Sequence, residues 1–154
     1  MIGNWKTAIA ILLAVVWAAA PAGARSLPKP SVTVLKVVDT GGGPPSINRV
    51  GEVSRTHGEL RDTAGNLIGS WRLSCTYFGG SGMQGQTSHF CKRVATFGSK
   101  GSIFSEGGIA WATNSTQWAV ITGGTGSFRG IFGTVKIANF NTPTTPSQYF
   151  LIRQ

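Results

Sequence analysis

Five acidic side chains supply all the carboxylate chemistry that this sequence can offer: Asp39, Glu52, Glu59, Asp62 and Glu106. Asp39 ends a β-branched run at residues 31–38 and precedes a Gly/Pro-rich loop, a position at the rim of a sheet or barrel. Apolar surroundings favour the protonated form of a carboxyl group, which can then act as a general acid or base. For each of the five, capping a turn or pairing with an arginine is the alternative.

Three other kinds of site find little support. His57 and His89 are far apart and lack the spacing of metal ligands, so we expect no metal site. The sequence contains no G-x-S-x-G element of a serine hydrolase. The glycine-rich segment 123–133 lacks the Lys-Ser/Thr ending of a P-loop and lies between two strand-like runs. It is predicted to be a hairpin turn rather than a phosphate site, and no cofactor is expected.

Composition and periodicity predict an all-β domain. The chain contains 22 glycines and only 12% charged residues, unlike a chain built from long helices. Trp71, Leu73, Cys75 and Tyr77 alternate with polar residues, which is typical of a strand with one buried face. The predicted strands are 31–38, 50–60 with a kink near Gly58, 67–78, 89–97, 102–111 broken at Gly107-Gly108, 117–122, 128–140 and 147–153. An antiparallel barrel or sandwich follows, and we expect an eight-stranded antiparallel β-barrel, which has room for one small ligand.

Cys75 and Cys91 lie on neighbouring predicted strands on either side of one loop. In a secreted protein two such cysteines are expected to form a disulfide. A reactive thiol is the alternative, but no predicted helix N-terminus lies nearby to lower its pKa.

The first 24 residues have the pattern of a secretory signal peptide. A charged residue, Lys6, precedes the apolar run 8–20, and the small residues 22–24 follow Pro21. We therefore expect secretion and a single mature domain at residues 25–154; an uncleaved anchor is the alternative. Asn114-Ser115-Thr116 is an N-glycosylation sequon in a predicted turn, relevant to a eukaryotic source.

The formal net charge of +9 comes from basic residues that are mostly scattered singly. This distribution argues against a dedicated nucleic-acid surface. An anionic cell wall, polysaccharide or membrane surface is one expected partner, and a merely solubilising charge is the alternative.

Aromatic residues are numerous for a small barrel, and most of them are expected in its core. Because one barrel cannot bury them all, some are expected to line a cavity or a subunit contact. Phe104, Trp111 and Tyr77 are the candidates for ligand contact.

The segment 118–130 (WAVITGGTGSFRG), followed by Gly133-Thr134-Val135, resembles the best-marked motif of dirigent proteins and allene oxide cyclases. The Asp39-Thr40 pair before Gly43-Pro44-Pro45 is similar to a dirigent segment in which an Asp ends the first strand. The resemblance implies an eight-stranded barrel that associates into homo-oligomers. It also implies a role for Asp39 as a proton donor or acceptor and for Arg129 in orienting a polar group of the ligand.

Two functions of different classes remain open. In the first, the barrel holds a small apolar or phenolic ligand, with radicals supplied by a separate oxidase, and directs stereoselective coupling or cyclisation. In the second, it is a secreted, non-catalytic binding protein for a lipid or a cell-wall component. An isomerase similar to the allene oxide cyclases is a variant of the first. In a plant, secretion would deliver the protein to the apoplast.

Overall fold

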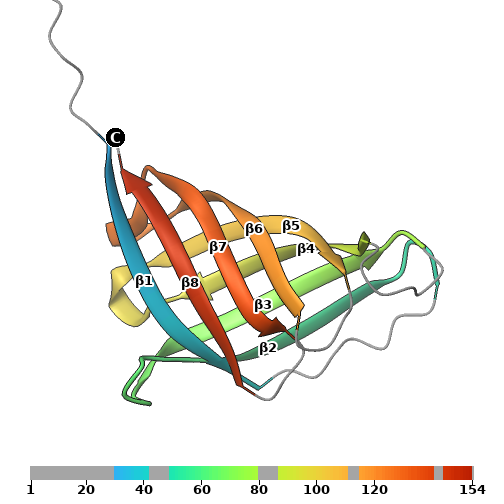
Figure 1. Ribbon diagram of the computed structural model, residues 1–154, viewed down its shortest axis with the longest axis horizontal. Coiled ribbons are helices and arrows are strands. Elements are labelled where there is room, and N and C mark those ends of the chain that lie inside the picture. Colours follow the sequence, from blue (N-terminus) through green and yellow to red (C-terminus); the bar gives the residue numbers. More distant parts are fainter. Residues whose placement is uncertain (1–29, 42–48, 80–86, 111–114, 141–143, 154) are drawn as a thin grey trace, which may run out of the picture.

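The chain forms a closed antiparallel barrel of eight strands in which each strand pairs with its neighbours in sequence and β8 closes against β1 (Figure 1). The computed structural model describes residues 30–41, 49–79, 87–110, 115–140 and 144–153. The predicted all-β, eight-stranded barrel is confirmed. Its strands are β1 (Ser31–Thr40), β2 (Val53–Arg61), β3 (Leu67–Tyr77), β4 (Thr87–Thr96), β5 (Ser102–Ala110), β6 (Ser115–Gly124), β7 (Ile131–Phe140) and β8 (Thr144–Arg153).

Alternation along each strand separates an inner from an outer set of side chains. In β3, Trp71, Leu73 and Cys75 are buried, as their spacing predicts, whereas Arg72 between them is exposed. The inward-facing side chains form one apolar core, whose fully buried members include Val37, Leu60, Ile103, Val135 and Tyr149. These side chains form the core that a barrel of this size is expected to have.

Cys75 and Cys91 are direct cross-strand partners on β3 and β4, and their sulfur atoms are bonded. Both side chains face the interior and are buried. The predicted disulfide is thus present, and none of the described cysteines is free. A link across 16 positions of sequence stabilises a fold by about 3 kcal/mol, mainly by restricting the unfolded chain.

The glycine-rich segment forms the turn between β6 and β7, but its conformation differs from a simple hairpin. A short 3-10 helix, η2 (Gly126–Phe128), follows β6 and packs against a second one, η1 (Gly98–Lys100), between β4 and β5. Gly126 has a φ of +58°, and a Cβ atom there would lie 2.5 Å from the carbonyl oxygen of Lys100. The close approach of these two turns therefore requires glycine at this position.

Several predicted strand boundaries were wrong. Ser115 and Thr116, expected at a turn tip, begin β6, and Phe128, expected in a strand, belongs to η2. β5 continues through Gly107 and Gly108 because both residues keep partners on β4. β8 begins at Thr144 and includes Pro146, which lies beyond the last described β7–β8 pair, so its missing N–H removes no bond to β7.

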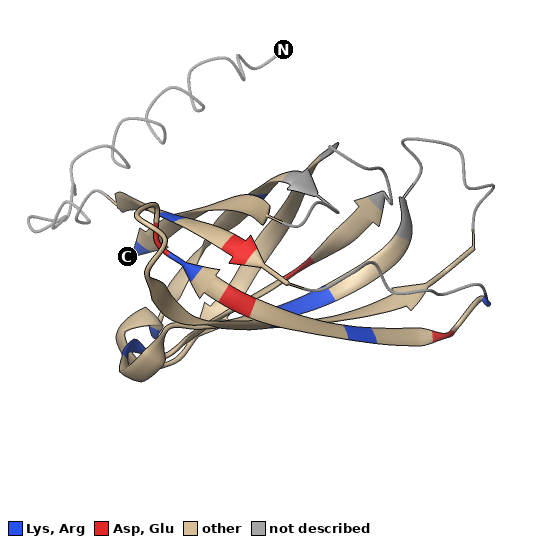
Figure 2. Cartoon of the chain, turned by 90° about the horizontal axis from the view of Figure 1, so that it is seen from below, with Lys and Arg blue, Asp and Glu red and all other residues tan. Residues whose placement is uncertain are grey.

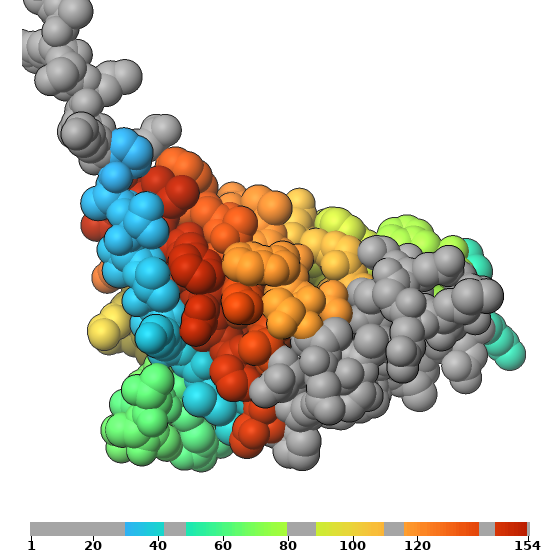
Figure 3. Space-filling view, in the orientation of Figure 1, coloured from blue at the N-terminus to red at the C-terminus, as the bar shows by residue number. Residues whose placement is uncertain are grey.

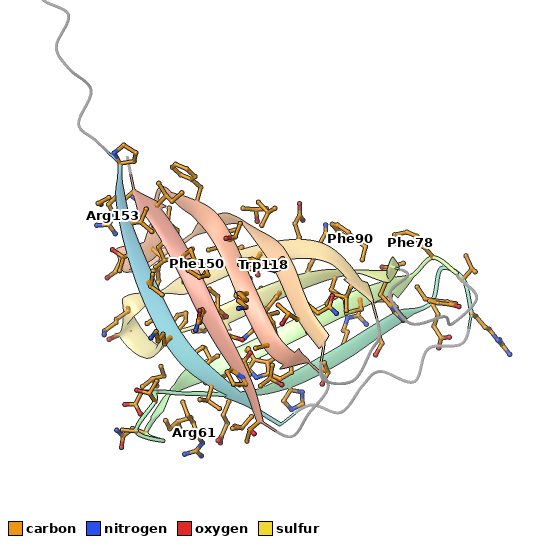
Figure 4. The ribbon with its side chains drawn as sticks, in the orientation of Figure 1. Arg61, Phe78, Phe90, Trp118, Phe150 and Arg153 are labelled. Carbon is orange, nitrogen blue, oxygen red and sulfur yellow. A yellow bond between two sulfur atoms is a disulfide. The ribbon has the colours of Figure 1, made fainter. Side chains whose placement is uncertain are left out.

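An apolar stripe crosses the outer surface of β6, β7, β8 and β1, the strands seen side by side in Figure 3. Val120, Thr134, Phe150 and Val34 occupy one continuous cross-strand row. Trp118 stacks on Phe150 with ring centroids 6.0 Å apart, as the labelled side chains in Figure 4 show. Trp118 and Val120 are 53% and 57% exposed, which is high for large apolar side chains that lie close together.

No helix in the described part of the chain has the length and apolarity needed to cross a bilayer.

Candidate functional site

A buried ion pair lies inside the barrel. Nη2 of Arg93, on β4, is 2.6 Å from Oδ1 of Asp39, near the end of β1. Ser147, on β8, donates its hydroxyl to the second carboxylate oxygen. Asp39 and Arg93 are only 4% and 7% exposed, so the pair is removed from water. Hydrogen bonds from Arg93 and Ser147 fix the position of the carboxylate in addition to the attraction of the charges.

Two aromatic rings flank the Arg93 guanidinium. Its central carbon lies 5.5 Å from the ring centre of Trp71 and 5.7 Å from that of Tyr149, within the range of a cation–π interaction. Burial opposes the charged form of Arg93, but the charge interactions with Asp39 and Tyr149 and the hydrogen bond to Asp39 together raise the pKa of the guanidinium. Burial also raises the pKa of Tyr149, against the opposing effect of Arg93. The site therefore places a guanidinium cation and a neutral phenol next to the Asp39 side chain.

Four buried polar atoms of this region have no hydrogen-bond partner among the described residues. They are Nε1 of Trp71, Nε of Arg93, Oγ of Ser105 and the hydroxyl of Tyr149. A buried polar group without a partner costs about 1–3 kcal/mol. Three of the four belong to Arg93 and the two rings beside it, so donors gather around one part of the interior. A ligand with oxygen acceptors would satisfy them.

Further polar side chains lie in the same half of the barrel. His89 is buried at the start of β4, and its ring lies 5.0 Å from that of Tyr77 at the end of β3. Gln117 on β6 and Thr145 on β8 are buried as well, and Thr145 is the direct partner of Asp39. Burial lowers the pKa of His89, which favours its neutral form. The half of the interior that contains Asp39 is thus the polar half.

The opposite end of the barrel carries an apolar pocket of about 560 Å³. Leu35, Ile68, Phe97, Phe128 and Leu151 supply its apolar wall. Phe128 belongs to η2, so the glycine-rich segment contributes to the edge of this pocket and not to the Asp39 site. The guanidinium of Arg153, labelled in Figure 4, donates a hydrogen bond to the carbonyl oxygen of Ser127 and ties η2 to the end of β8.

The structure separates the residues that the sequence suggested for the site. Asp39 is buried in the interior, whereas Arg129 follows η2 and is exposed. Tyr77 is half-buried beside His89, but Phe104 projects from the outer surface of β5 between the buried Ile103 and Ser105. Asp39 therefore has Arg93, not Arg129, as its arginine partner.

Two predicted site residues, Trp111 and Asn114, lie outside the described residues, as do positions 1–24 of the predicted signal peptide. Within the described ranges, no three His, Cys, Asp or Glu side chains are grouped so that they could hold a metal ion.

The sequence did not single out Arg93, Ser147 or Tyr149. A signal for Arg93 was available, because it lies two positions after Cys91 and therefore shares the inner face of the same strand. Ser147 and Tyr149 alternate along β8 in the same way with buried side chains. Which of these inner residues would meet Asp39 depends on the closure of β8 against β1, which a strand pattern does not reveal.

Fold and site together define a closed β-barrel with a buried charged pair in one half of a largely apolar interior. No protein-family model and no curated protein sequence matches the chain. Similar solved structures exist. A pyocyanin demethylase matches with a TM-score of 0.60 and 19% identity, over 79% of this chain and 99% of that one. The pterocarpan synthase dirigent protein GePTS1 matches with a TM-score of 0.61 and 14% identity, over 85% and 94%.

The exo-specific intermolecular Diels-Alderase AbnU is also similar, with a TM-score of 0.62 and 15% identity over 81% of this chain and 99% of that one. At these identities the likeness concerns the fold alone. The chain accordingly has a dirigent-like barrel fold, as the glycine-rich motif predicted.

Proposed function

We propose that this protein binds a small apolar or phenolic ligand inside its barrel and steers a stereoselective coupling or cyclisation of that ligand. The observation that carries the proposal is the buried Asp39–Arg93 ion pair, which lies beside donors that have no partner among the described residues. Keeping two charges away from water is costly. A ligand that interacts with Asp39 and Arg93 would explain why the two charges are buried. The fold shared with a dirigent protein and a Diels-Alderase also supports a function in steering a reaction.

In this proposal the barrel acts mainly by restricting the conformations of its ligand, so that one face of a reactive intermediate is presented. Asp39 gives a proton to, or takes one from, a quinone-methide-like intermediate. Arg93, with the rings of Trp71 and Tyr149 beside it, orients an oxygen of the ligand. The orienting role predicted for Arg129 stays a prediction, because that side chain follows η2 and is exposed, away from the buried Asp39.

We also propose where the protein acts and which partners it needs. The protein is secreted after removal of residues 1–24, works as a homo-oligomer and needs no cofactor of its own. A separate oxidase supplies phenoxy radicals where the reaction is a coupling. The exposed stripe that contains Trp118 and Val120 supports the oligomer.

The test is a coupling assay with a propenyl phenol and a one-electron oxidant, in which chiral chromatography measures the enantiomeric ratio of the products. The protein is expected to shift the ratio away from 1:1, and Asp39→Asn to restore a racemic mixture. Glu59→Gln is the matched control, because it also removes one carboxylate but from the outer surface. Equal selectivity of the wild type and Asp39→Asn would reject the role of Asp39.

A second candidate function is favoured by the apolar pocket at the other end of the barrel. That pocket suits the acyl chain of a lipid, and a protein that used it would be a non-catalytic carrier. Native mass spectrometry of the secreted protein distinguishes the two. A retained lipid that is lost in Phe128→Asp but kept in Asp39→Asn would favour the carrier, and retention of a phenolic compound with the opposite pattern would favour the steering protein.

A further inference from the structure

A second surface, on the outside of β2, β3 and β4, has the features of a binding site. Arg55 and His57 on β2, Arg72 and Ser74 on β3, and Lys92 and Val94 on β4 line a shallow groove of about 460 Å³, which we call the basic groove. Figure 2, seen from below, shows the Lys and Arg positions of the strands in blue and the Asp and Glu positions in red.

Strand register places the cations of the basic groove next to one another. Arg55 is the partner of Ser74, and Ser74 is in turn the partner of Lys92, so these three form one row across the strands. In the adjacent row Arg72 lies between His57 and Val94. Two strand spacings separate Arg55 from Lys92, a width of about 10 Å. The positive charges are therefore distributed over a surface and not gathered at one point.

The three cations of the groove, Arg55, Arg72 and Lys92, form no ion pair with a described residue. Ion pairs between described residues are confined to Arg61 with Glu59 and to the interior pair, and no described carboxylate lines the groove. Glu106, the cross-strand partner of Lys92 on β5, forms no ion pair with it. Three exposed cations on one face that form no ion pair with a described residue fit an anionic partner.

The lining of the groove limits the class of that partner. Charges spread over about 10 Å fit a polymer with repeated anionic groups better than one isolated anion. No Phe, Tyr or Trp is among the described lining residues, so the groove offers no stacking surface for nucleic-acid bases. Arginine binds carboxylates through paired N–H donors, and the Ser74 hydroxyl between Arg55 and Lys92 can bond to a sugar hydroxyl.

We propose that the basic groove binds a linear carboxylated polysaccharide and so holds the protein on an anionic matrix. This site is independent of the steering function, because the groove faces outward whereas the Asp39 site faces inward. Arg93 illustrates the separation, since it lies between Lys92 and Val94 on β4 but points into the barrel. A bound polymer would leave the interior site free.

The experiment measures binding of the secreted protein to polygalacturonate by co-sedimentation at several NaCl concentrations. The wild type is expected to bind, with an affinity that falls as salt rises. Replacing Arg55, Arg72 and Lys92 together by serine should weaken binding about tenfold or more, and R55S or K92S alone roughly two- to fivefold. All three side chains are exposed, so the variants should keep the wild-type circular dichroism spectrum. Should the triple variant lose that spectrum, the two single variants decide the question.

A matched triple variant, K36S/K100S/K136S, removes the same number of charges outside the groove and should change the affinity less than twofold. Equal losses in the two triple variants would show that net charge alone drives binding, and would overturn the proposal. It would also be overturned by a wild type that does not bind, or by single-stranded DNA that binds as tightly as polygalacturonate.

Discussion

Asp39 and Arg93 are 54 positions apart in sequence, on strands that do not pair, and they meet across the barrel interior with 2.6 Å between Oδ1 and Nη2. The bond joins β1 to β4 through the interior, in addition to the ladders that run around the barrel wall. Ser147 extends the connection to β8. Three strands are thus held together at the polar half of the interior, and the consequences for stability can be measured.

Removing one partner of this pair should lower the free energy of unfolding far more than removing both partners. Arg93→Met leaves the Asp39 carboxylate buried without its cation, which should lower the free energy of unfolding by about 3–5 kcal/mol. The double variant Asp39→Asn/Arg93→Met removes both charges and should recover most of that loss. Urea denaturation followed by circular dichroism measures each value.

The exposed pair between Arg61 and Glu59 provides the comparison, since its N···O distance is also 2.6 Å. Arg61→Met should lower the free energy of unfolding by no more than about 1 kcal/mol, because water screens the pair. Similar losses from Arg61→Met and Arg93→Met would show that burial does not determine the cost of breaking these pairs.

The sequence predicted the barrel well because strand periodicity and turn residues are local signals. Leu67–Tyr77 and its buried face follow directly from alternation, and the disulfide follows from two cysteines on adjacent strands. The arginine partner of Asp39, in contrast, could not be predicted from such local signals. Arg129 is prominent in the motif, but its place after η2 exposes it. Arg93 is inconspicuous in the sequence, and only the closure of the barrel brings it to the carboxylate.

Tyr149 offers a way to separate a structural from a binding role. Its buried hydroxyl has no partner among the described residues, so Tyr149→Phe removes no protein hydrogen bond. We expect the free energy of unfolding to stay equal or to rise by about 1 kcal/mol, because an unpaired buried hydroxyl is lost. If the hydroxyl forms a hydrogen bond to the ligand, the same variant should bind a phenolic ligand several-fold more weakly in a calorimetric titration. A clear loss of stability would show instead that the hydroxyl is bonded within the fold.

His89 should make stability depend on pH below neutrality. Burial lowers the pKa of its imidazole in the folded protein, whereas the ordinary value is 6.5. As pH falls below about 6.5, the unfolded chain binds a proton more readily than the folded one, so the free energy of unfolding decreases. This decrease continues until the pH reaches the lowered pKa of the folded state.

The measurement for His89 is the urea midpoint between pH 8 and pH 5.5, with His89→Gln beside the wild type. The midpoint of the wild type should fall with pH over this range, and that of the variant should change less. His57→Gln is the control, because His57 is exposed on the outer surface. Parallel curves for the wild type and His89→Gln would assign the pH dependence to other groups.

The outer apolar stripe around Trp118 and Val120 is expected to join copies of the chain. Trp118 and Val120 are more than half exposed, and Trp118 is stacked on Phe150 with the Lys136 amine 5.9 Å from its ring centre. If this surface joins copies of the chain, Val120→Arg places a charge in each contact, and light scattering should show dissociation to monomers. Val53→Arg, on the outer surface of β2, adds the same charge away from the stripe and should leave the mass unchanged. A wild-type protein that is monomeric at all concentrations would show that the stripe does not join copies of the chain.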